Sequence, residues 1–238
     1  MVARDTTEEH RASTPLELLF DLCFVVAVSQ ASDRLHHALT SGEVGHGIGG
    51  YLLVFFAIWW AWVNFTWFAS AYDNDDVAYR VTTLVQITGA LILAAGVPRA
   101  FDDNNFTVVV IGYVVMRLAM VGQWLRAAYS DPYRRWTALR FAIGITIVQA
   151  AWVARLWLPS RLGLASFLVL VVAELLVPIV AERAERTTWH AVHIAERYGL
   201  FTLIVLGESI LAATTAVQTA FDTGRHLGSL SVVAAAGL

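Results

Sequence analysis

The sequence predicts an all-α bundle of transmembrane helices, a polytopic fold with about seven spans and the start of an eighth. Three observations support this fold class. The 238 residues are 58% hydrophobic and only 15% charged, with a mean hydropathy of +0.61, which is far more apolar than a soluble domain requires. The apolar residues form blocks long enough to cross a hydrocarbon core of about 30 Å. These long blocks do not alternate as barrel strands do, so helices are the expected spanning element.

The bundle is expected to begin directly after a polar segment, residues 1–14. Thr14, Pro15 and Glu17 predict a helix start, because a threonine N-cap, a proline at the first helical position and a glutamate three residues after the cap form a capping box. The bundle itself is expected over residues 15–217, with residues 218–238 as a loop and the start of a truncated helix. The expected spans lie near residues 15–39, 48–71, 77–97, 106–129, 138–158, 162–181 and 190–217.

Local signals set the limits of the central spans. The second span is rich in tryptophan and phenylalanine, some of which we expect in a belt at the membrane interface. The acidic cluster Asp73-Asn-Asp-Asp76 interrupts the apolar run and is expected to cap the third span, because carboxylates favour helix N-termini; cation binding at the membrane face is the alternative. Pro98 and Pro159 are expected to end the third and fifth spans, and Pro178 to kink the sixth.

Arginine placement predicts the orientation of the bundle, since the chain contains no lysine. With seven spans, more arginines lie on the side of the membrane that holds the N-terminus than on the other side, and only Arg117 lies in the middle of a span. The excess of positive charge predicts a multi-pass protein of the cell membrane with a cytoplasmic N-terminus. The N-terminal side collects Arg4, Arg11, Arg80, Arg126, Arg134, Arg135, Arg140, Arg183, Arg186 and Arg197, and the other side Arg34, Arg99, Arg155, Arg161 and Arg225.

Ionisable residues inside the spans are the first candidates for function. Asp21, Arg117, Glu174 and Glu208 fall within the first, fourth, sixth and seventh spans. An isolated charge costs roughly 2.5–3.5 kcal/mol or more in the middle of a bilayer, so we expect these groups to face one another or a water-filled cavity. Arg117 is expected to pair with Glu174 or Asp21. Glu208 follows Gly207, which would allow a close helix crossing, and is a candidate gate or proton carrier.

The start of the seventh span adds a second group of candidates. On a helix, His190, Arg197 and Glu208 fall almost on one line, with His193 about 60° to one side. The spacing of His190, His193 and Glu196 invites a metal site. However, His190 and Glu196 would lie about 120° apart, too splayed for one ion, so no metal is predicted and a polar network is favoured.

Supporting roles are expected for residues near the N-terminal side of the bundle. Glu17 has a sufficient structural role in the capping box, with proton or cation binding as the alternative. Asp21 lies one turn further along the same face and has no capping role, so that transport and a structural ion pair both remain open. Arg80 lies in the first turns of the third span.

Five motifs occur in order along the chain. They are Pro15-Leu-Glu17-Leu-Leu-Phe20-Asp21-Leu, Asp73-Asn-Asp-Asp76-Val-Ala-Tyr-Arg80, Tyr113-Val-Val-Met-Arg117, His193-Ile-Ala-Glu196-Arg197-Tyr-Gly199-Leu-Phe201 and Leu206-Gly207-Glu208-Ser209. Together they resemble the bacterial low temperature requirement protein A family. The resemblance implies a polytopic membrane protein, associated by name with growth in the cold, whose molecular activity is not settled. Members of this family are typically longer, which implies that the chain corresponds to their N-terminal part.

The number of ionisable groups predicted inside the bundle favours transport of a small solute or ion, with proton coupling as one form. Asp21, Glu174 and Glu208 would exchange charge during transport. Arg117 and Arg197 would bias the pKa values of these carboxyl groups.

Two other functions are compatible with the sequence. One is an intramembrane enzyme acting on lipid or isoprenoid substrates, with His190 and His193 as acid, base or metal ligands, and the other is a sensor or stress protein that transports nothing. No complete catalytic constellation is present, so enzyme activity is not favoured and no catalytic residue, metal or cofactor is assigned. The lipid bilayer is the expected partner, and a homo-oligomer is compatible with the chain. The net charge of −3 provides no basic surface for nucleic acid.

Overall fold

The structure is a computed structural model that describes residues 1–4, 13–73 and 75–222. Within these residues the chain forms seven helices, all of them long and apolar enough to cross a membrane. This result confirms the predicted all-α class of a multi-pass membrane protein. The helices are α1 (Pro15–Thr40), α2 (Val44–Ala71), α3 (Val77–Asp102), α4 (Thr107–Ser130), α5 (Arg135–Arg155), α6 (Gly163–Ala181) and α7 (Ala191–Asp222).

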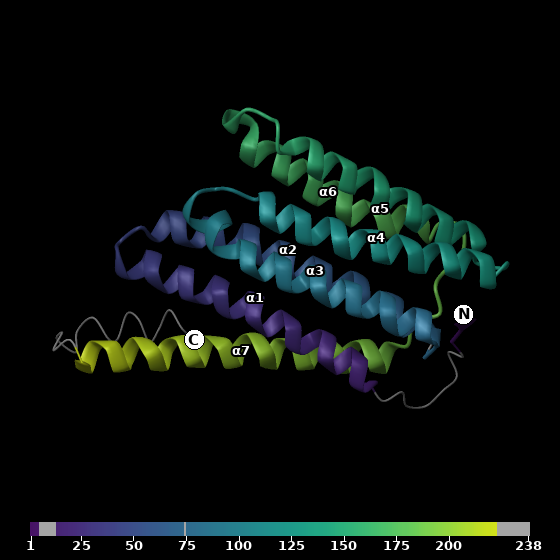
Figure 1. Ribbon diagram of the computed structural model, residues 1–238, viewed down its shortest axis with the longest axis horizontal. Coiled ribbons are helices and arrows are strands. Elements are labelled where there is room, and N and C mark those ends of the chain that lie inside the picture. The colour runs from purple at the N-terminus through teal and green to yellow at the C-terminus, as the bar shows by residue number, and fades with distance from the viewer. Residues whose placement is uncertain (5–12, 74, 223–238) are drawn as a thin grey trace.

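The helices lie roughly along one direction, and their order across the bundle differs from their order in the chain. Figure 1 shows the α5–α6 hairpin at one edge, then α4, then α2 and α3, and finally α1 and α7 at the opposite edge. Two short strands, β1 (Val2–Ala3) and β2 (Tyr72–Asp73), pair in antiparallel fashion beside the N-terminal end of the bundle. A short 3-10 helix, η1 (Ser160–Leu162), lies in the α5–α6 connection.

The helix limits differ from the expected spans at several points. Pro98 does not end α3, which continues to Asp102, because a proline near a helix end removes only one backbone hydrogen bond. Residues 218–222, expected as a loop, form the last turn of α7. The expected start of an eighth helix lies outside the described residues. The predicted capping box is confirmed: Glu17 N donates to Thr14 Oγ1 over 3.2 Å, and Thr14 N donates to Glu17 Oε2 over 3.3 Å.

The aromatic residues of α2 fill the interior of the bundle more than they line its surface. α2 contacts α1, α3, α4 and α7. Trp60, Trp62, Phe65 and Phe68 are therefore buried, and these four residues do not belong to the expected interfacial belt. Large rings bury much apolar surface, which is why a helix with several neighbours can use them for packing. α2 is consequently placed to contact charged groups on two sides of the bundle.

The helices α3 and α4 approach each other most closely at glycine. A Cβ atom added to Gly112 would lie 2.5 Å from Leu93 N and 2.6 Å from Gly89 O. Both are backbone atoms, which cannot move aside as a flexible side chain can. The α3–α4 crossing therefore requires glycine at position 112.

We expect Gly112→Ala to lower the free energy of unfolding by about 1–3 kcal/mol, because the added methyl group forces the two backbones apart. Thermal denaturation of the purified protein in detergent measures the change. Gly122→Ala is the matched control on the same helix, since a Cβ atom at Gly122 meets nothing within 4 Å. Equal stabilities of the two variants would contradict the close crossing.

Candidate functional site

Two neighbouring tryptophans of α2 direct their indole N–H groups to opposite sides of the helix. Trp60 Nε1 donates to Glu174 Oε2 over 2.8 Å, and Trp62 Nε1 donates to Asp21 Oδ1 over 2.6 Å. Residues two positions apart on a helix are separated by about 200°, which explains the opposite directions. The buried charges therefore form two clusters, one on each side of α2, and not the single polar core that the sequence suggested.

The first cluster joins α1 to α7 and consists of Glu17, Asp21, His193 and Arg197; we call it the α1–α7 cluster. His193 Nε2 lies 3.1 Å from Glu17 Oε2, and Arg197 Nη1 lies 3.2 Å from the same oxygen. Arg197 Nη2 donates to Asp21 Oδ1 over 2.6 Å. All four residues are at most 1% exposed. The two carboxylates are thus held by a guanidinium and an imidazole away from solvent.

The spacing within the α1–α7 cluster explains its geometry. Glu17 and Asp21 lie four residues apart on α1, and His193 and Arg197 lie four residues apart on α7, so each pair occupies one helix face. The separation in sequence is 176 residues both for Glu17 with His193 and for Asp21 with Arg197. α1 and α7 therefore run in the same direction with matched register. Trp62 closes the cluster from α2 and stacks on Phe201, with ring centroids 4.5 Å apart.

The second cluster joins α4 to α6 and consists of Arg117, Glu174, Trp60 and Tyr113; we call it the α4–α6 cluster. Arg117 Nη2 donates to Glu174 Oε2 over 2.8 Å, which confirms one of the two partners expected for Arg117. The guanidinium carbon also lies 5.1 Å from the ring centroid of Tyr113. The Tyr113 hydroxyl donates to the carbonyl oxygen of Ala57 over 3.0 Å. Arg117 and Glu174 are both 3% exposed.

Both clusters leave buried polar atoms without hydrogen bonds to the described residues. These atoms are Asp21 Oδ2, Arg117 Nη1 and Arg197 Nε; Arg197 Nη1 also forms no hydrogen bond to the described residues, but it is ion-paired with Glu17 Oε2. An unsatisfied buried donor or acceptor costs about 1–3 kcal/mol, and more when the group is charged. The carboxylate oxygen is able to accept a proton or a hydrogen bond, and the guanidinium nitrogens are able to donate to water or to a ligand. The clusters are therefore the candidate sites for function within the described bundle.

Glu208 lies apart from both clusters. Its side chain is half-buried, and no hydrogen bond or ion pair links it to another described residue. A Cβ atom on the preceding Gly207 would meet nothing within 4 Å, so no tight crossing forms there. The expectation that Glu208 meets charges of the first, fourth and sixth spans is wrong, because those charges pair with Trp62, Arg197 and each other.

The histidines of α7 have different surroundings. His190 precedes the first residue of α7, and its Nδ1 accepts from His193 N over 3.3 Å, as an N-cap side chain does. His190 N donates to Ser70 Oγ over 3.0 Å, which ties the start of α7 to α2. Glu196 is exposed on the helix surface. The described residues contain no group of three or more His, Cys, Asp or Glu placed to hold a metal ion.

The acidic cluster before α3 does cap this helix. Asp76 Oδ1 accepts from Tyr79 N over 2.7 Å, and Asp76 Oδ2 lies 2.7 Å from Arg126 Nη2. Arg80 pairs with Asp75 at 2.6 Å on the surface, so its role is local. The Tyr79 N–H and the Arg126 guanidinium hold the pKa of Asp76 below its usual range. A lowered folded-state pKa means that ionised Asp76 stabilises the fold above the unfolded pKa, and that this contribution is lost as pH falls through the folded value.

We expect Asp76→Ala to lower the free energy of unfolding by about 1 kcal/mol near pH 7, as for other N-cap substitutions. The difference from the wild type should shrink as pH falls below about 3.9, the ordinary aspartate value. Denaturation curves between neutral and acidic pH measure it, with Asp103→Ala, on an exposed aspartate after α3, as control. A difference independent of pH would show that the carboxylate charge is not involved.

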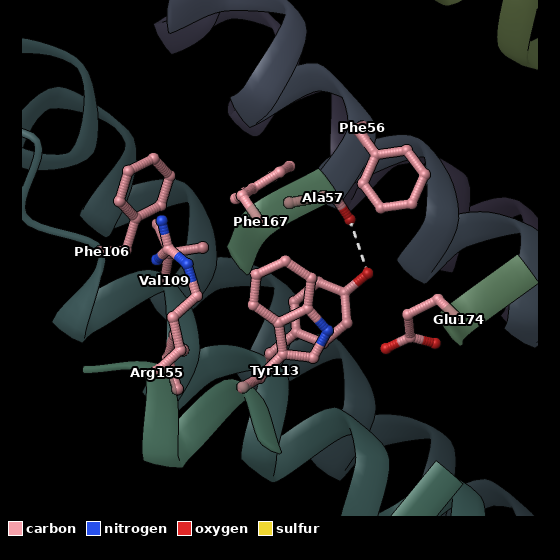
Figure 2. A pocket seen from close by; sticks show the side chains of 10 residues that line it. Phe56, Ala57, Phe106, Val109, Tyr113, Arg155, Phe167 and Glu174 are labelled. Atoms are coloured by element: carbon pink, nitrogen blue, oxygen red, sulfur yellow. Dashed lines mark hydrogen bonds between the residues drawn. The ribbon is translucent and has the colours of Figure 1, made fainter. Parts of the chain in front are cut away.

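Three spaces with shared lining residues lie between the end of the bundle opposite the N-terminus and the α4–α6 cluster. The outermost, which we call the vestibule, measures about 580 Å³ and lies between the α3–α4 and α5–α6 connections. The second, the aromatic pocket, is narrow at about 30 Å³ and is lined by Phe106, Tyr113, Arg155 and Glu174 among others (Figure 2). The third is an inner cavity of about 10 Å³ beside Arg117.

Sequence reasoning missed these spaces and the residues that connect them. The vestibule and the aromatic pocket share Phe106 and Arg155, and the aromatic pocket and the inner cavity share Tyr113. Figure 2 shows the carboxylate of Glu174 and the hydroxyl of Tyr113 at one end of the pocket, with the guanidinium of Arg155 at the other. The placement of Arg155 at the end of a span was visible in the sequence. Its position between two cavities depends on how α4, α5 and α6 pack.

The fold and the two clusters define a class of protein, a polytopic helical membrane protein with ion pairs buried between its spans. The chain belongs to the bacterial low temperature requirement A protein (LtrA) family, whose sequence profile it matches over residues 12–238. It is also 29% identical, over 220 residues, to an uncharacterized protein of Rhizobium meliloti. That match covers 87% of this chain and 52% of the relative, so the chain spans about half of the relative's length. No solved structure matches the chain.

Proposed function

We propose that the protein transports a small solute or ion across the cell membrane, through the side of the bundle formed by α2, α4, α5 and α6. The observation that carries this proposal is the row of spaces from the vestibule to the buried Arg117–Glu174 pair. Ionisable groups inside membrane spans are costly, and in transporters they mark solute and proton pathways. A buried ion pair with successive spaces toward one end of the bundle is suited to a site with access from that side.

Glu174 is the group in this row that is able to exchange a proton. Its Oε2 accepts from both Trp60 and Arg117, so protonation of the carboxyl group would weaken both interactions. Arg117, whose Nη1 already lacks a partner among the described residues, would then be free to bind a solute. Proton binding and solute binding are thereby coupled through one ion pair.

The α1–α7 cluster has a supporting role in this proposal. It holds α1 and α7 together through buried ion pairs, and none of the three spaces is lined by its charged residues. With the N-terminus in the cytoplasm, as the arginine distribution predicts, the vestibule faces the outside of the cell.

The test is a flux assay in liposomes that contain the purified protein and a pH-sensitive dye. Sodium acetate, potassium chloride, ammonium chloride and single amino acids are added outside in turn, with and without a pH gradient. At least one solute should change the internal pH faster than in protein-free liposomes. If every solute behaves as in protein-free liposomes, the protein is not a transporter of this kind, and a sensor or structural role is favoured.

A further inference from the structure

Arg155 is a cation at the junction of the vestibule and the aromatic pocket. Its Nε donates to Ser166 Oγ over 3.2 Å, and its Nη2 donates to the carbonyl oxygen of Gly163 over 2.9 Å. Both partners are neutral. Among the described residues no carboxylate lies within ion-pair distance of Arg155, and no hydrogen bond is formed by its Nη1. The guanidinium is therefore held in place without compensation of its charge.

Three aromatic rings surround the same guanidinium. Its carbon lies 5.5 Å from the ring centroid of Phe106, 5.8 Å from that of Trp152 and 5.4 Å from that of Phe167. Cation–π contacts of this kind orient a guanidinium, but they bring no negative charge. Figure 2 shows the Arg155 side chain ending with its guanidinium beside Phe106 and Val109. The side chain is thus fixed while its positive charge remains available to a ligand.

The remaining wall of the vestibule favours negative charge. α4 begins at Thr107 and α6 at Gly163, and both residues line the vestibule, so the positive ends of two helix dipoles add to the charge of Arg155. The amide side chains of Asn104 and Asn105 also line it and offer hydrogen-bond donors. Asp103 is the acidic residue of the lining, and it is exposed at the rim, where water screens it.

We propose that the vestibule binds a small monovalent anion, of the size of a short carboxylate, against the guanidinium of Arg155. This anion is also the solute of the transport proposed above, and that second statement rests on the proposed function. The aromatic pocket shares Arg155 with the vestibule and is also lined by Glu174, whose negative charge would repel an anion. A proton on Glu174 removes the repulsion and leaves Arg117 as the next cation. One proton and one anion therefore move together, and the net charge transferred is zero.

Binding is tested on the purified protein in detergent, without reference to flux. Sodium acetate is titrated while tryptophan fluorescence is recorded, because Trp152 contacts the guanidinium. Arg155→Gln should weaken acetate binding about tenfold or more, the loss expected for one charge-assisted hydrogen bond. Arg155→Lys should retain part of the affinity, because it retains the charge. Arg161→Gln is the matched control, since Arg161 is an exposed arginine at the same end of the bundle.

A second measurement uses the wild-type protein and does not depend on the folding of a variant. Phenylglyoxal modifies accessible guanidinium groups, and mass spectrometry identifies the modified arginines. Acetate should protect Arg155 and not Arg161. Equal protection of both residues, or equal acetate affinity in Arg155→Gln and the wild type, would overturn the proposal. The proposal would also be overturned if the fluorescence change seen with sodium acetate disappeared when choline acetate was used, because the response would then depend on sodium and not on acetate.

The two proposals can fail separately. Acetate binding at Arg155 without flux of any solute would keep the anion site and remove the transport function. Solute flux that is unchanged in Arg155→Gln, with acetate binding lost in the same variant, would keep transport and the anion site but would show that the bound anion is not the transported solute.

Discussion

Glu174→Gln is expected to reduce proton-coupled flux to the level of protein-free liposomes. Glutamine has nearly the shape of glutamate and can still accept a hydrogen bond from Trp60, but it neither carries a charge nor exchanges a proton. In the proposed mechanism, protonation of Glu174 releases Arg117 to bind the solute. Glutamine at position 174 is always neutral, so proton binding can no longer control Arg117. The liposome assay with the internal dye measures the loss, once a transported solute has been found for the wild type.

The controls for this result separate a functional from a structural effect. Glu208→Gln changes an ionisable residue of a spanning helix that lies outside both clusters, and its flux should equal that of the wild type. Because Glu174→Gln leaves Arg117 buried without its anion, folding is checked by size-exclusion chromatography and thermal denaturation. The double variant Arg117→Gln, Glu174→Gln removes both charges and should recover stability without recovering flux. Full flux in either folded variant would show that this ion pair carries no coupling.

Arg197→Ala is expected to cause the largest loss of stability, about 3–5 kcal/mol in the free energy of unfolding. Arg197 is fully buried and contacts two carboxylates, Glu17 at 3.2 Å and Asp21 at 2.6 Å. Removing the guanidinium leaves both carboxylates in the interior with a single imidazole beside them. A buried charge without a partner costs far more than a surface ion pair contributes. Thermal and chemical denaturation in detergent measure the loss.

Two comparisons make this prediction specific. Arg80→Ala also removes an arginine from an ion pair, but Asp75 and Arg80 are exposed to solvent, so the expected change in stability is small. Adding Asp21→Asn to Arg197→Ala removes one of the stranded charges and should restore part of the stability, which a double-mutant cycle quantifies. A loss no larger than that of Arg80→Ala would show that the α1–α7 cluster contributes little to the fold.

The two clusters differ in whether their charged residues line the three spaces. The α1–α7 cluster lines none of the three spaces with its charged residues, whereas the α4–α6 cluster meets two of them. We therefore expect Arg197→Ala to act first on stability and Glu174→Gln to act first on flux. This separation follows from the position of α2, which lies between the clusters and donates one indole N–H to each.

Local chemistry was readable from the sequence alone. The capping box at Thr14 and Glu17 depends on residues three apart, and the common face of Glu17 and Asp21 depends on residues four apart. Apolar blocks of membrane-spanning length predicted seven helices, because a bilayer leaves no other way to satisfy the backbone. Even Arg117 with Glu174 was one of two predicted pairs, since buried charges of opposite sign must meet.

Tertiary structure alone decided which buried charges meet. Helical periodicity places Glu208 on nearly the same line of α7 as Arg197. Arg197 lies where α7 contacts α1 and pairs with Asp21, whereas Glu208 lies further along α7 and pairs with none of the buried charges of the described residues. Likewise, the neighbouring sequence does not distinguish Trp60 and Trp62 from the other aromatic residues of α2. In the structure, these two tryptophans each bind one of the two polar clusters. The sequence determined the helices, their faces and the presence of buried charge, because these depend on neighbours along the chain. Partners and cavities depend on helix order and rotation, which only the packing of all seven helices sets.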